Sequence, residues 1–551
     1  MKNGITTAFG LQGGAVAHIF DSFERKGLSV VYTAHEAAAS LAAAAYAKSK
    51  NGLGCCVVTT GPGTTNALTG LLGAWQDSIP CIFLSGQVRS NHMSYGRPVR
   101  QVGTQEVNIV DIVRPITKWA TVLKSSKEIE KTLSLAINRA LSGRPGPVWI
   151  DIPLEFQWDD TIEFNLKNYR PISQKNEKKD FENEFKIFEK WLQESACPLF
   201  ILGYGIFLSG CVKRTRTFLR DNQFMFVSTW TGVGILGTDD ALNLGIIGMS
   251  GQPGANKAVF KADLLVCLGT HLGIPHTTTL TENYAPKAKK VFVNIDGDQL
   301  NNLSVSSDLT MNCDLRDFFE RLNERKFFQT KSYKELTGLK QMNVKKIESQ
   351  NNVVDSNNFF RTLTAMTASD DAIIVDGGGT ALYTGFQSAI IKENQRMICS
   401  SSISSMGTGF AEVIGAFMSK KFRKFYCIIG DGSALMNVQD LQTIRDLEIP
   451  VVICLINNNG YLAIRHTQES FLEKRFFGTH PDWNLGKINF KLVSNTFGLE
   501  YLKIRKESDI LGCCKKLIYS TKPTICEVIT SEKQKPLFSQ GYQKNKDGTH
   551  T

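Results

Sequence analysis

Short apolar runs of strand length alternate with amphipathic stretches of helix length along most of the chain. The runs are rich in Val, Ile and Leu and are bounded by Gly, Pro and Asn, which is typical of buried strands. The pattern predicts strands at 29–32, 55–59, 81–85, 199–202, 224–227, 264–268, 290–295, 372–375, 397–399, 425–429, 451–456 and 524–529. Between them it predicts helices, among them 37–48, 66–75 and 436–447. Strands that alternate with helices in this way form parallel sheets with helices on both faces.

Two polar segments divide this alternation into three parts. The segments 158–190 and 325–354 are rich in charged residues and Asn and are expected to be linkers. We therefore predict an α/β protein of three successive doubly wound parallel-sheet domains, at 1–165, 190–325 and 355–530, followed by a tail at 531–551. A chain of 551 residues is long enough to bury that number of cores.

The composition excludes several classes of protein. A hydrophobic content of 42% and a charged content of 21% are typical of a soluble globular protein. The net charge of +11 comes from scattered lysines without an aromatic-basic stripe, so we expect anionic small molecules and no nucleic acid as partners. Most of the 13 cysteines sit in apolar runs, which indicates reduced thiols in a cytoplasmic protein. No apolar run is long enough to span a bilayer and no signal peptide is evident, so no membrane partner is expected.

The stretch 424–460 carries the most specific chemical signal. One apolar run ends in Gly430-Asp431-Gly432, and the next ends in Asn457-Asn458-Asn459-Gly460. A strand–helix–strand unit delivers both strand ends to one edge of the sheet, so Asp431 and Asn458 are expected to lie close together. Their side-chain oxygens and the Gly460 carbonyl suit Mg²⁺, and the glycines let a diphosphate approach the backbone. Each motif by itself is also an ordinary turn after a buried strand.

Together, these two motifs resemble the signature of thiamine diphosphate enzymes. About residues 4–530 are similar to the acetolactate synthase and pyruvate oxidase group of that family, including the branch found in surface-polysaccharide clusters. The resemblance rests further on Phe9-Gly10 with Gly13-Gly14, His35-Glu36, Gly61-Pro62-Gly63-Thr64-Thr65-Asn66, Gly143-Arg144-Pro145-Gly146-Pro147 and Met406-Gly407. It implies pyrimidine-binding, central and diphosphate-binding domains in that order, with thiamine diphosphate and Mg²⁺ as cofactors.

The resemblance assigns catalytic roles to Glu36, Gln105 and Met406. Glu36 would hydrogen-bond the aminopyrimidine ring and promote its imino tautomer, which needs a buried carboxyl with a raised pKa. Met406 would hold the cofactor in its bent form, and Gln105 would lie near the bound substrate. Without the resemblance, Glu36 is a first-turn acid of an Ala-rich helix, Met406 a core residue and Gln105 part of a surface loop.

The resemblance also implies which residues bind the cofactor and its metal. The cofactor-binding set is Glu36, Gly61, Pro62, Met406, Gly430, Asp431, Gly432, Ser433, Asn458 and Gly460. The metal ligands are Asp431, Asn458 and Gly460.

Flavin binding is left open by the resemblance. Arg144 matches an arginine that binds FAD, and the segment 244–249 is similar to a flavin-binding loop. The segment 269–273 lacks the arginine that related synthases carry there. The central domain is therefore either an FAD-binding domain or a flavin-free remnant.

The acceptor side departs from acetolactate synthases. Thr467 stands where those enzymes place a pocket tryptophan, beside Arg465 and His466. An insertion at 89–102 adds Arg97 and Arg100. These residues favour a wider, more basic pocket for a larger or anionic acceptor such as a nucleotide-linked keto sugar. If they face solvent instead, an ordinary acetolactate synthase is expected.

The sequence therefore predicts a thiamine diphosphate-dependent transferase. It would decarboxylate a 2-keto acid such as pyruvate and transfer the hydroxyethyl unit to a carbonyl acceptor. The alternatives are a 2-keto acid decarboxylase or oxidase, and a catalytically inactive structural or regulatory homologue. Glu36 and Asp431 belong to different sheets that must face each other across the cofactor. The resemblance implies that the facing pair comes from two chains, so a homodimer or homotetramer with shared sites is expected. The alternative is a monomer whose 1–150 and 355–530 segments fold onto each other.

Overall fold

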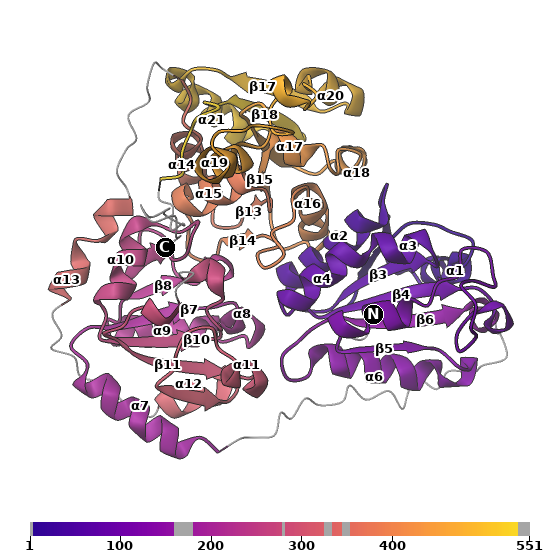
Figure 1. Cartoon of the computed structure of the whole chain (residues 1–551), viewed down its shortest axis with the longest axis horizontal. Helices are drawn as coiled ribbons and strands as arrows, with labels where there is room; N and C mark the ends of the chain where they lie inside the picture. The colour runs from indigo at the N-terminus through magenta and orange to yellow at the C-terminus, as the bar shows by residue number, and fades with distance from the viewer. Residues whose placement is uncertain (1–3, 159–179, 278–280, 324–332, 344–352, 538–551) are drawn as a thin grey trace. The chain divides into compact units, whose positions relative to one another are not determined.

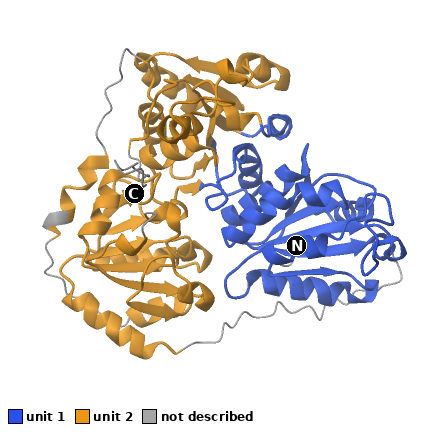
Figure 2. Ribbon diagram, viewed as in Figure 1, with its two compact units in different colours: residues 1–176, 398–425, 436–449 blue, residues 177–397, 426–435, 450–551 orange. Residues whose placement is uncertain are grey.

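The structure, a computed structural model, describes residues 4–158, 180–277, 281–323, 333–343 and 353–537 (Figure 1). It contains three six-stranded sheets with intervening helices, which confirms the expected α/β class. The chain groups into two compact units, shown in Figure 2: unit 1 holds residues 1–176, 398–425 and 436–449, and unit 2 holds residues 177–397, 426–435 and 450–551. Unit 1 thus takes two segments from the C-terminal part of the chain, and the three expected domain boundaries stay a prediction.

The first sheet lies in unit 1 and has the strand order β2-β1-β3-β4-β6-β5. All its pairings are parallel. Its strands are β1 (Thr7–Gly10), β2 (Ser29–Tyr32), β3 (Gly54–Thr59), β4 (Cys81–Gln87), β5 (Trp119–Val122) and β6 (Val148–Pro153). Its helices are α1 (Ala17–Arg25), α2 (Glu36–Lys50), α3 (Pro62–Asn66), α4 (Leu68–Gln76), α5 (Ile109–Val113) and α6 (Ile129–Leu141).

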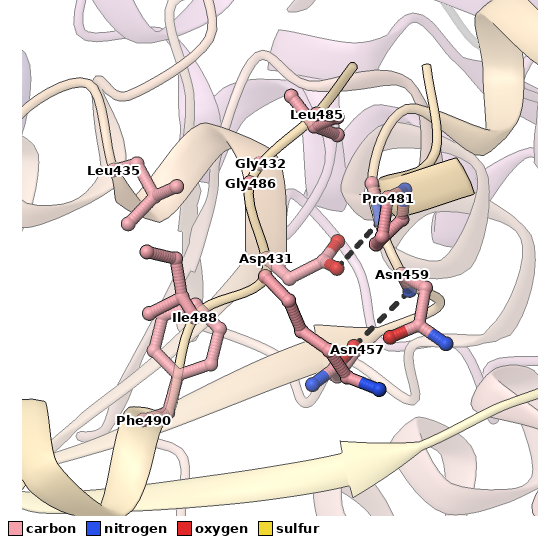
Figure 3. A pocket seen from close by; sticks show the side chains of 12 residues that line it. Asp431, Gly432, Leu435, Asn457, Asn459, Pro481, Leu485, Gly486, Ile488 and Phe490 are labelled. Carbon is pink, nitrogen blue, oxygen red and sulfur yellow. Dashed lines mark hydrogen bonds between the residues drawn. The ribbon is translucent and has the colours of Figure 1, made fainter. Parts of the chain in front are cut away.

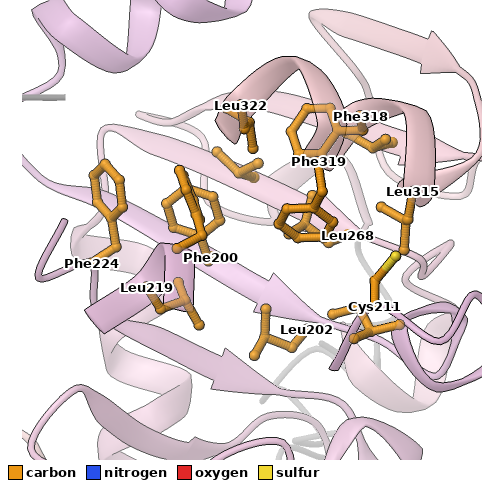
Figure 4. Packing of buried hydrophobic residues seen from close by; sticks show 14 of the residues in the cluster. Phe200, Leu202, Cys211, Leu219, Phe224, Leu268, Leu315, Phe318, Phe319 and Leu322 are labelled. Atoms are coloured by element: carbon orange, nitrogen blue, oxygen red, sulfur yellow. The ribbon is translucent and has the colours of Figure 1, made fainter. Parts of the chain in front are cut away.

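The second sheet lies in unit 2 and has the order β12-β11-β10-β7-β8-β9. Its strands are β7 (Pro198–Leu202), β8 (Phe226–Ser228), β9 (Asn243–Ile246), β10 (Leu264–Leu268), β11 (Lys289–Asn294) and β12 (Leu309–Asn312). Its main helices are α7 (Glu182–Glu194), α9 (Val212–Asp221), α10 (Pro253–Lys261) and α12 (Leu315–Asn323). Figure 4 shows its phenylalanine-rich core, in which Phe200 and Leu202 of β7 lie among side chains of α9 and α12.

The third sheet has the order β14-β13-β15-β16-β18-β17, which repeats the strand order of the first sheet. Its strands are β13 (Ala372–Val375), β14 (Arg396–Ile398), β15 (Phe425–Gly430), β16 (Val451–Asn457), β17 (Glu500–Ile504) and β18 (Thr524–Ile529). Its helices include α14 (Ser356–Ala365), α15 (Gly379–Ser388), α16 (Gly409–Met418), α17 (Asp431–Ala434), α18 (Asp440–Asp446), α19 (Leu462–Phe471), α20 (Phe490–Phe497) and α21 (Ile510–Tyr519). Because β15 and β16 are neighbours, their ends reach the same edge of the sheet, as the sequence predicts.

The alanine-rich helix α2 packs closely against α16 within unit 1. A Cβ added to Gly415 would lie only 2.1 Å from the carbonyl oxygen of Ala42. Ala38, Leu41 and Ala411 fill the remainder of this contact. The run of small residues in α2 is therefore explained by a close helix crossing.

Two secondary-structure expectations are wrong. The helix expected at 436–447 begins only at Asp440, because Asn437 donates its side-chain Nδ2 to the Gly407 carbonyl at 2.8 Å and the chain makes successive turns there. The expected linker 158–190 ends in helix α7, whose Phe185, Phe188 and Leu192 are buried. Residues 159–179 of that linker lie outside the described residues, as do 325–332 and 344–352 of the second expected linker and 538–551 of the expected tail. The described part of the second linker contains the short helix α13 (Lys334–Thr337), whose Leu336 is buried.

Candidate active site

Asp431 stands where the buried strand β15 ends and the short helix α17 begins. Asp431 is only 7% exposed, and its Oδ2 accepts a hydrogen bond of 2.7 Å from the main-chain amide of Gly460. Its Oδ1 is buried and has no hydrogen-bond partner among the described residues. Burial raises the pKa of Asp431 to about 6. A buried carboxylate oxygen without a donor fits a cation ligand.

Asn458 follows β16 and presents a second buried oxygen. The residue is 1% exposed, and its Nδ2 donates to Thr380 Oγ1 at 3.2 Å. That hydrogen bond orients the amide and leaves Oδ1 buried without a partner among the described residues. Gly460, with φ of +117°, turns the loop so that its amide reaches Asp431. Asp431 Oδ1 and Asn458 Oδ1 are therefore two uncommitted oxygens, buried atoms that accept no hydrogen bond from the described residues. Together with the Gly460 carbonyl, they are hard oxygen ligands of the kind that Mg²⁺ prefers.

A hollow of about 370 Å³ lies beside these residues (Figure 3). Gly430 is the last residue of β15, and Gly432 and Ser433 lie buried in α17. A Cβ on Gly432 would come within 2.3 Å of the Tyr461 ring, so glycine is required there. The hollow is lined by Asp431, Gly432, Leu435, Asn457, Asn459, Gly460, Pro481, Leu485, Gly486, Lys487, Ile488 and Phe490.

Glu36 is the first residue of α2 and is 8% exposed. His35 caps the helix by accepting from the Ala37 amide at its Nδ1, 3.1 Å away. Asn66, at the end of α3, donates its Nδ2 to Glu36 Oε2 at 3.0 Å. In the sequence, Asn66 stands out only as the last residue of the motif 61–66, and nothing there indicates that it is the hydrogen-bond partner of Glu36. The two motifs His35-Glu36 and 61–66 therefore meet at this carboxyl.

Gln105 has a strained backbone and lies next to the same motif. It is exposed and adopts φ of +61°, a conformation that is uncommon for residues other than glycine. Its carbonyl oxygen would be 2.5 Å from a Cβ on Gly61, which opens the turn into Pro62 and α3. Thr60 Oγ1 approaches that same carbonyl at 3.4 Å.

Two buried carboxylates hold the segment that carries Gln105. Asp151 accepts from Gln87 Nε2 and Tyr95 OH, each at 3.0 Å. Burial raises the pKa of Asp151 to about 6. Glu106 accepts from the amide and hydroxyl of Ser94, at 3.0 and 2.7 Å. The middle of the expected insertion at 89–102 is thus fastened through Ser94 and Tyr95, and the contact of Ser94 with Glu106 restrains the neighbour of the exposed Gln105.

Met406 is half-buried and lies in unit 1 with Glu36. The preceding segment is fastened by a buried ion pair between Lys48 and Asp77, whose Nζ and Oδ2 are 2.9 Å apart. Asp77 also accepts from the amides of Ser401 and Ser402. Unit 1 therefore holds Glu36, Gly61, Pro62, Gln105, Arg144 and Met406, and unit 2 holds Gly430, Asp431, Gly432, Ser433, Asn458 and Gly460.

The structure leaves the flavin expectation a prediction. Arg144 Nε donates to Ser78 Oγ at 2.8 Å. In the central sheet, the loops after β7 and β10 touch: the Gly205 amide donates to the Gly269 carbonyl at 3.0 Å. A Cβ on Gly203 would lie 2.3 Å from that carbonyl oxygen. These backbones meet where the strand order reverses, the position at which open α/β sheets bind ligands.

The expectation that Arg465 adds positive charge to the acceptor pocket is wrong. Arg465 is 6% exposed, and its guanidinium donates to main-chain carbonyls. His466 is half-buried, and burial lowers its pKa, so it is neutral near pH 7. Thr467, by contrast, is exposed, as are Arg97 and Arg100 of the insertion.

The described part of the chain lacks two other features that could indicate a function. Those residues contain no cluster of three or more His, Cys, Asp or Glu side chains that could hold a metal. None of the described helices combines the length and the apolar character needed to cross a membrane. The pair of uncommitted oxygens at Asp431 and Asn458 is therefore the cation site that the described residues support best.

Three protein-family models match the chain in order along the sequence. The thiamine pyrophosphate enzyme N-terminal TPP binding domain matches residues 1–112. The central domain of the same enzymes matches residues 188–322, and their C-terminal TPP binding domain matches residues 377–528.

Similar proteins extend over nearly the whole chain. The acetolactate synthase large subunit of Lactococcus lactis is 29% identical over 539 residues, covering 96% of this chain and 91% of the relative. Acetolactate synthase isozyme 2 large subunit of Escherichia coli is 27% identical over 544 residues, covering 96% and 93%. A probable acetolactate synthase large subunit of Methanocaldococcus jannaschii is 28% identical over 550 residues, covering 96% and 89%.

Proposed function

The chain belongs to the thiamine pyrophosphate enzymes, whose three domains it carries in order, and on that premise we propose that it is a carboligase. It decarboxylates a 2-keto acid, with pyruvate as the first candidate, and transfers the two-carbon unit to a carbonyl acceptor. Relatives named acetolactate synthase, similar over 96% of this chain, support this class of reaction.

The observation that carries the proposal is the pair of uncommitted buried oxygens, Asp431 Oδ1 and Asn458 Oδ1. The hydrogen bond from the Gly460 amide to Asp431 Oδ2 holds the loop that carries Asn458 against Asp431. These residues would hold Mg²⁺, and the cation would in turn bind the diphosphate of the cofactor. When bound, thiamine diphosphate supplies the nucleophilic carbon and the electron sink that decarboxylation of a 2-keto acid requires.

The residues of unit 1 would serve the other end of the cofactor. Glu36, which accepts a hydrogen bond from Asn66 at Oε2, would hydrogen-bond the aminopyrimidine ring and exchange a proton with it. Met406 would support the bent cofactor, and the exposed side chain of Gln105 would orient the substrate. Gly61 and Pro62 shape the turn that lets the backbone of Gln105 approach α3.

The acceptor is the finer part of the proposal. The exposed Arg97 and Arg100 favour a larger and more highly charged anionic acceptor, such as a nucleotide-linked keto sugar with its diphosphate, over a singly charged second keto acid. Arg465 no longer contributes to this argument, because main-chain carbonyls occupy its guanidinium. Catalytic sites would be shared between two chains of a homodimer, so that Glu36 of one chain meets Asp431 of the other.

Product analysis tests the proposal. The purified protein is incubated with thiamine diphosphate, Mg²⁺ and pyruvate, first alone, then with 2-ketobutyrate, and then with a nucleotide-linked keto sugar. We expect CO₂ release and a new carbon–carbon bond to one of the added acceptors. Acetaldehyde as the only product indicates a decarboxylase, and acetate formed with consumption of an electron acceptor indicates an oxidase. A protein that binds no thiamine diphosphate with Mg²⁺ is a non-catalytic homologue.

A further inference from the structure

Arg465 is a buried cation whose hydrogen bonds all go to the main chain. It lies on α19 and is 6% exposed. Its Nη2 donates to the Asn458 carbonyl at 2.7 Å, and its Nη1 donates to the Asn459 and Thr479 carbonyls, each at 2.9 Å. A fourth carbonyl, that of Glu532, lies 3.4 Å from Nη2. Burying a guanidinium is costly, and several well-formed hydrogen bonds are needed to offset that cost.

The carbonyls of Asn458, Asn459 and Thr479 belong to two segments of the chain that border the same hollow. Asn458 and Asn459 follow β16, and Asn458 carries one of the two uncommitted oxygens. Thr479 directly precedes the segment 480–490, from which Pro481 and Leu485 line the hollow. The Tyr461 amide donates to the same Thr479 carbonyl at 3.0 Å. One side chain therefore ties the loop after β16 to the opposite wall.

Other contacts complete the restraint of this loop and leave the candidate ligand atoms uncommitted. The side-chain Nδ2 of Asn458 donates to Thr380 Oγ1, and the main-chain amide of Gly460 donates to Asp431 Oδ2. Asn459 has a left-handed backbone with φ of +57°, and its amide donates to Asn457 Oδ1 at 3.1 Å. The carbonyls of Asn458 and Asn459 on either side of that strained residue are the ones Arg465 holds.

We propose that Arg465 is a positioning residue for the metal loop, residues 457–460, and sets the affinity of that loop for its divalent cation. The inference rests on the proposed function, which places the cation there. Arg465 has two opposing effects on the affinity of the loop for a divalent cation. Its positive charge repels a nearby divalent cation, whereas its hydrogen bonds hold Asn458 where the cation needs it. Positioning is the larger effect in this proposal.

The opposite signs make the test decisive. Arg465→Lys keeps the charge and loses the fork of donors, and Arg465→Met removes both. If positioning dominates, both variants bind the cation more weakly. If charge dominates, Arg465→Met binds it more tightly than the wild type. Arg216→Met is the matched control, because Arg216 also donates to two main-chain carbonyls, those of Gly234 and Ile235, but lies on α9 of the central sheet.

The measurement is a titration of the full chain with Mn²⁺ in the presence of thiamine diphosphate. Binding is detected as a decrease in the electron paramagnetic resonance signal of the free ion. We expect the dissociation constant to rise about 10–100-fold in both Arg465 variants, the usual effect of losing an outer-shell partner. It stays within about twofold of wild type in Arg216→Met. Melting temperatures in EDTA show whether the Arg465 variants lose more stability than the control.

Unchanged or tighter Mn²⁺ binding in the Arg465 variants overturns the inference while leaving the proposed function intact. A wild-type protein that binds no Mn²⁺ with thiamine diphosphate overturns both. If Arg465→Lys and Arg465→Met both fail to fold, the inference is also overturned. A residue that acts only on the metal loop can be replaced while the rest of unit 2 stays folded.

Discussion

Replacing Lys48 by Met should loosen the segment that precedes Met406. Lys48 Nζ lies 2.9 Å from Asp77 Oδ2, and the two side chains are only 5% and 4% exposed. Lys48 also donates to the Cys399 carbonyl, and Asp77 accepts from Ser401 and Ser402. The substitution leaves the Asp77 carboxylate buried without a cation.

The size of the effect follows from this geometry. Removing one partner of a buried ion pair typically costs about 3–5 kcal/mol. Asp77 keeps the two amides and the hydroxyl that donate to it, so we expect the lower end, about 3 kcal/mol. A local change of that size increases the opening of the segment by roughly 100-fold.

The pH dependence has a defined sign. Burial alone would raise the pKa of Asp77, but Lys48 and the donors of Ser402 and Ser401 outweigh it and hold that pKa below its usual value. In the wild type, this pair therefore stabilises the fold above the unfolded pKa of about 4, and the contribution is lost as the pH falls through the lower folded pKa. The deficit of Lys48→Met should accordingly be complete from pH 7 down to about 4 and narrow only as the pH falls below about 4.

Hydrogen exchange measured by mass spectrometry checks the predicted opening of the segment that precedes Met406. The method reports on local opening and does not assume that so long a chain unfolds in one step. Peptides that contain Ser401 and Ser402 should exchange about 100-fold faster in Lys48→Met, and adding Asp77→Asn should restore part of the protection. Arg25→Met is the control, because the Arg25–Asp21 pair has the same chemistry but side chains that are 76% and 52% exposed. Equal exchange in Lys48→Met and wild type would refute the reasoning.

Three further predictions concern the candidate active site. Glu36→Gln should still bind thiamine diphosphate but lose activity by ~10²-fold or more, as expected for a proton-transfer group, and near-normal turnover would exclude the role. Asp431→Ala should weaken Mg²⁺ and cofactor binding by more than the ~10–100-fold of an outer-shell change, with activity partly recovered at high concentrations of both; unchanged affinity in a titration would contradict the metal assignment. Mixing and reassociating these two inactive variants should return about a quarter of wild-type activity if sites are shared between chains, whereas mixed dimers without activity would rule out sharing.

Most strands in the middle of the sheets could be predicted from the sequence alone. The bounds of β10, β13 and β18 agree with the expected ranges, because fully buried strands of parallel sheets are continuous apolar runs. The strands β1, β5, β6, β9, β12 and β17 were not expected. Of these, β5, β9, β12 and β17 lie at the edges of their sheets and are partly exposed, so their apolar runs are interrupted. The strands β1 and β6 are buried inside their sheet but contain Gly10, Asp151 and Pro153, which break the apolar run.

The meeting of Asp431 with the loop after β16 also follows from sequence. A parallel crossover unit must deliver both strand ends to one edge, whatever the rest of the chain does. The hydrogen bond between Gly460 and Asp431 agrees with that expectation. The chemical roles of Glu36, Gln105 and Met406 remain predictions, because the resemblance alone assigns them.

Contacts between distant segments were decided only by the tertiary structure. Arg465 resembles a pocket cation in the sequence, yet it holds the Asn458 and Thr479 carbonyls. Asn66 proves to be the hydrogen-bond partner of Glu36. The small side chains of α2 allow it to pack closely against α16 at Gly415. The physical reason is the same in each case. The order of apolar and polar residues along the chain determines which positions are buried, whereas the partner of a buried polar group depends on which other segment packs against it.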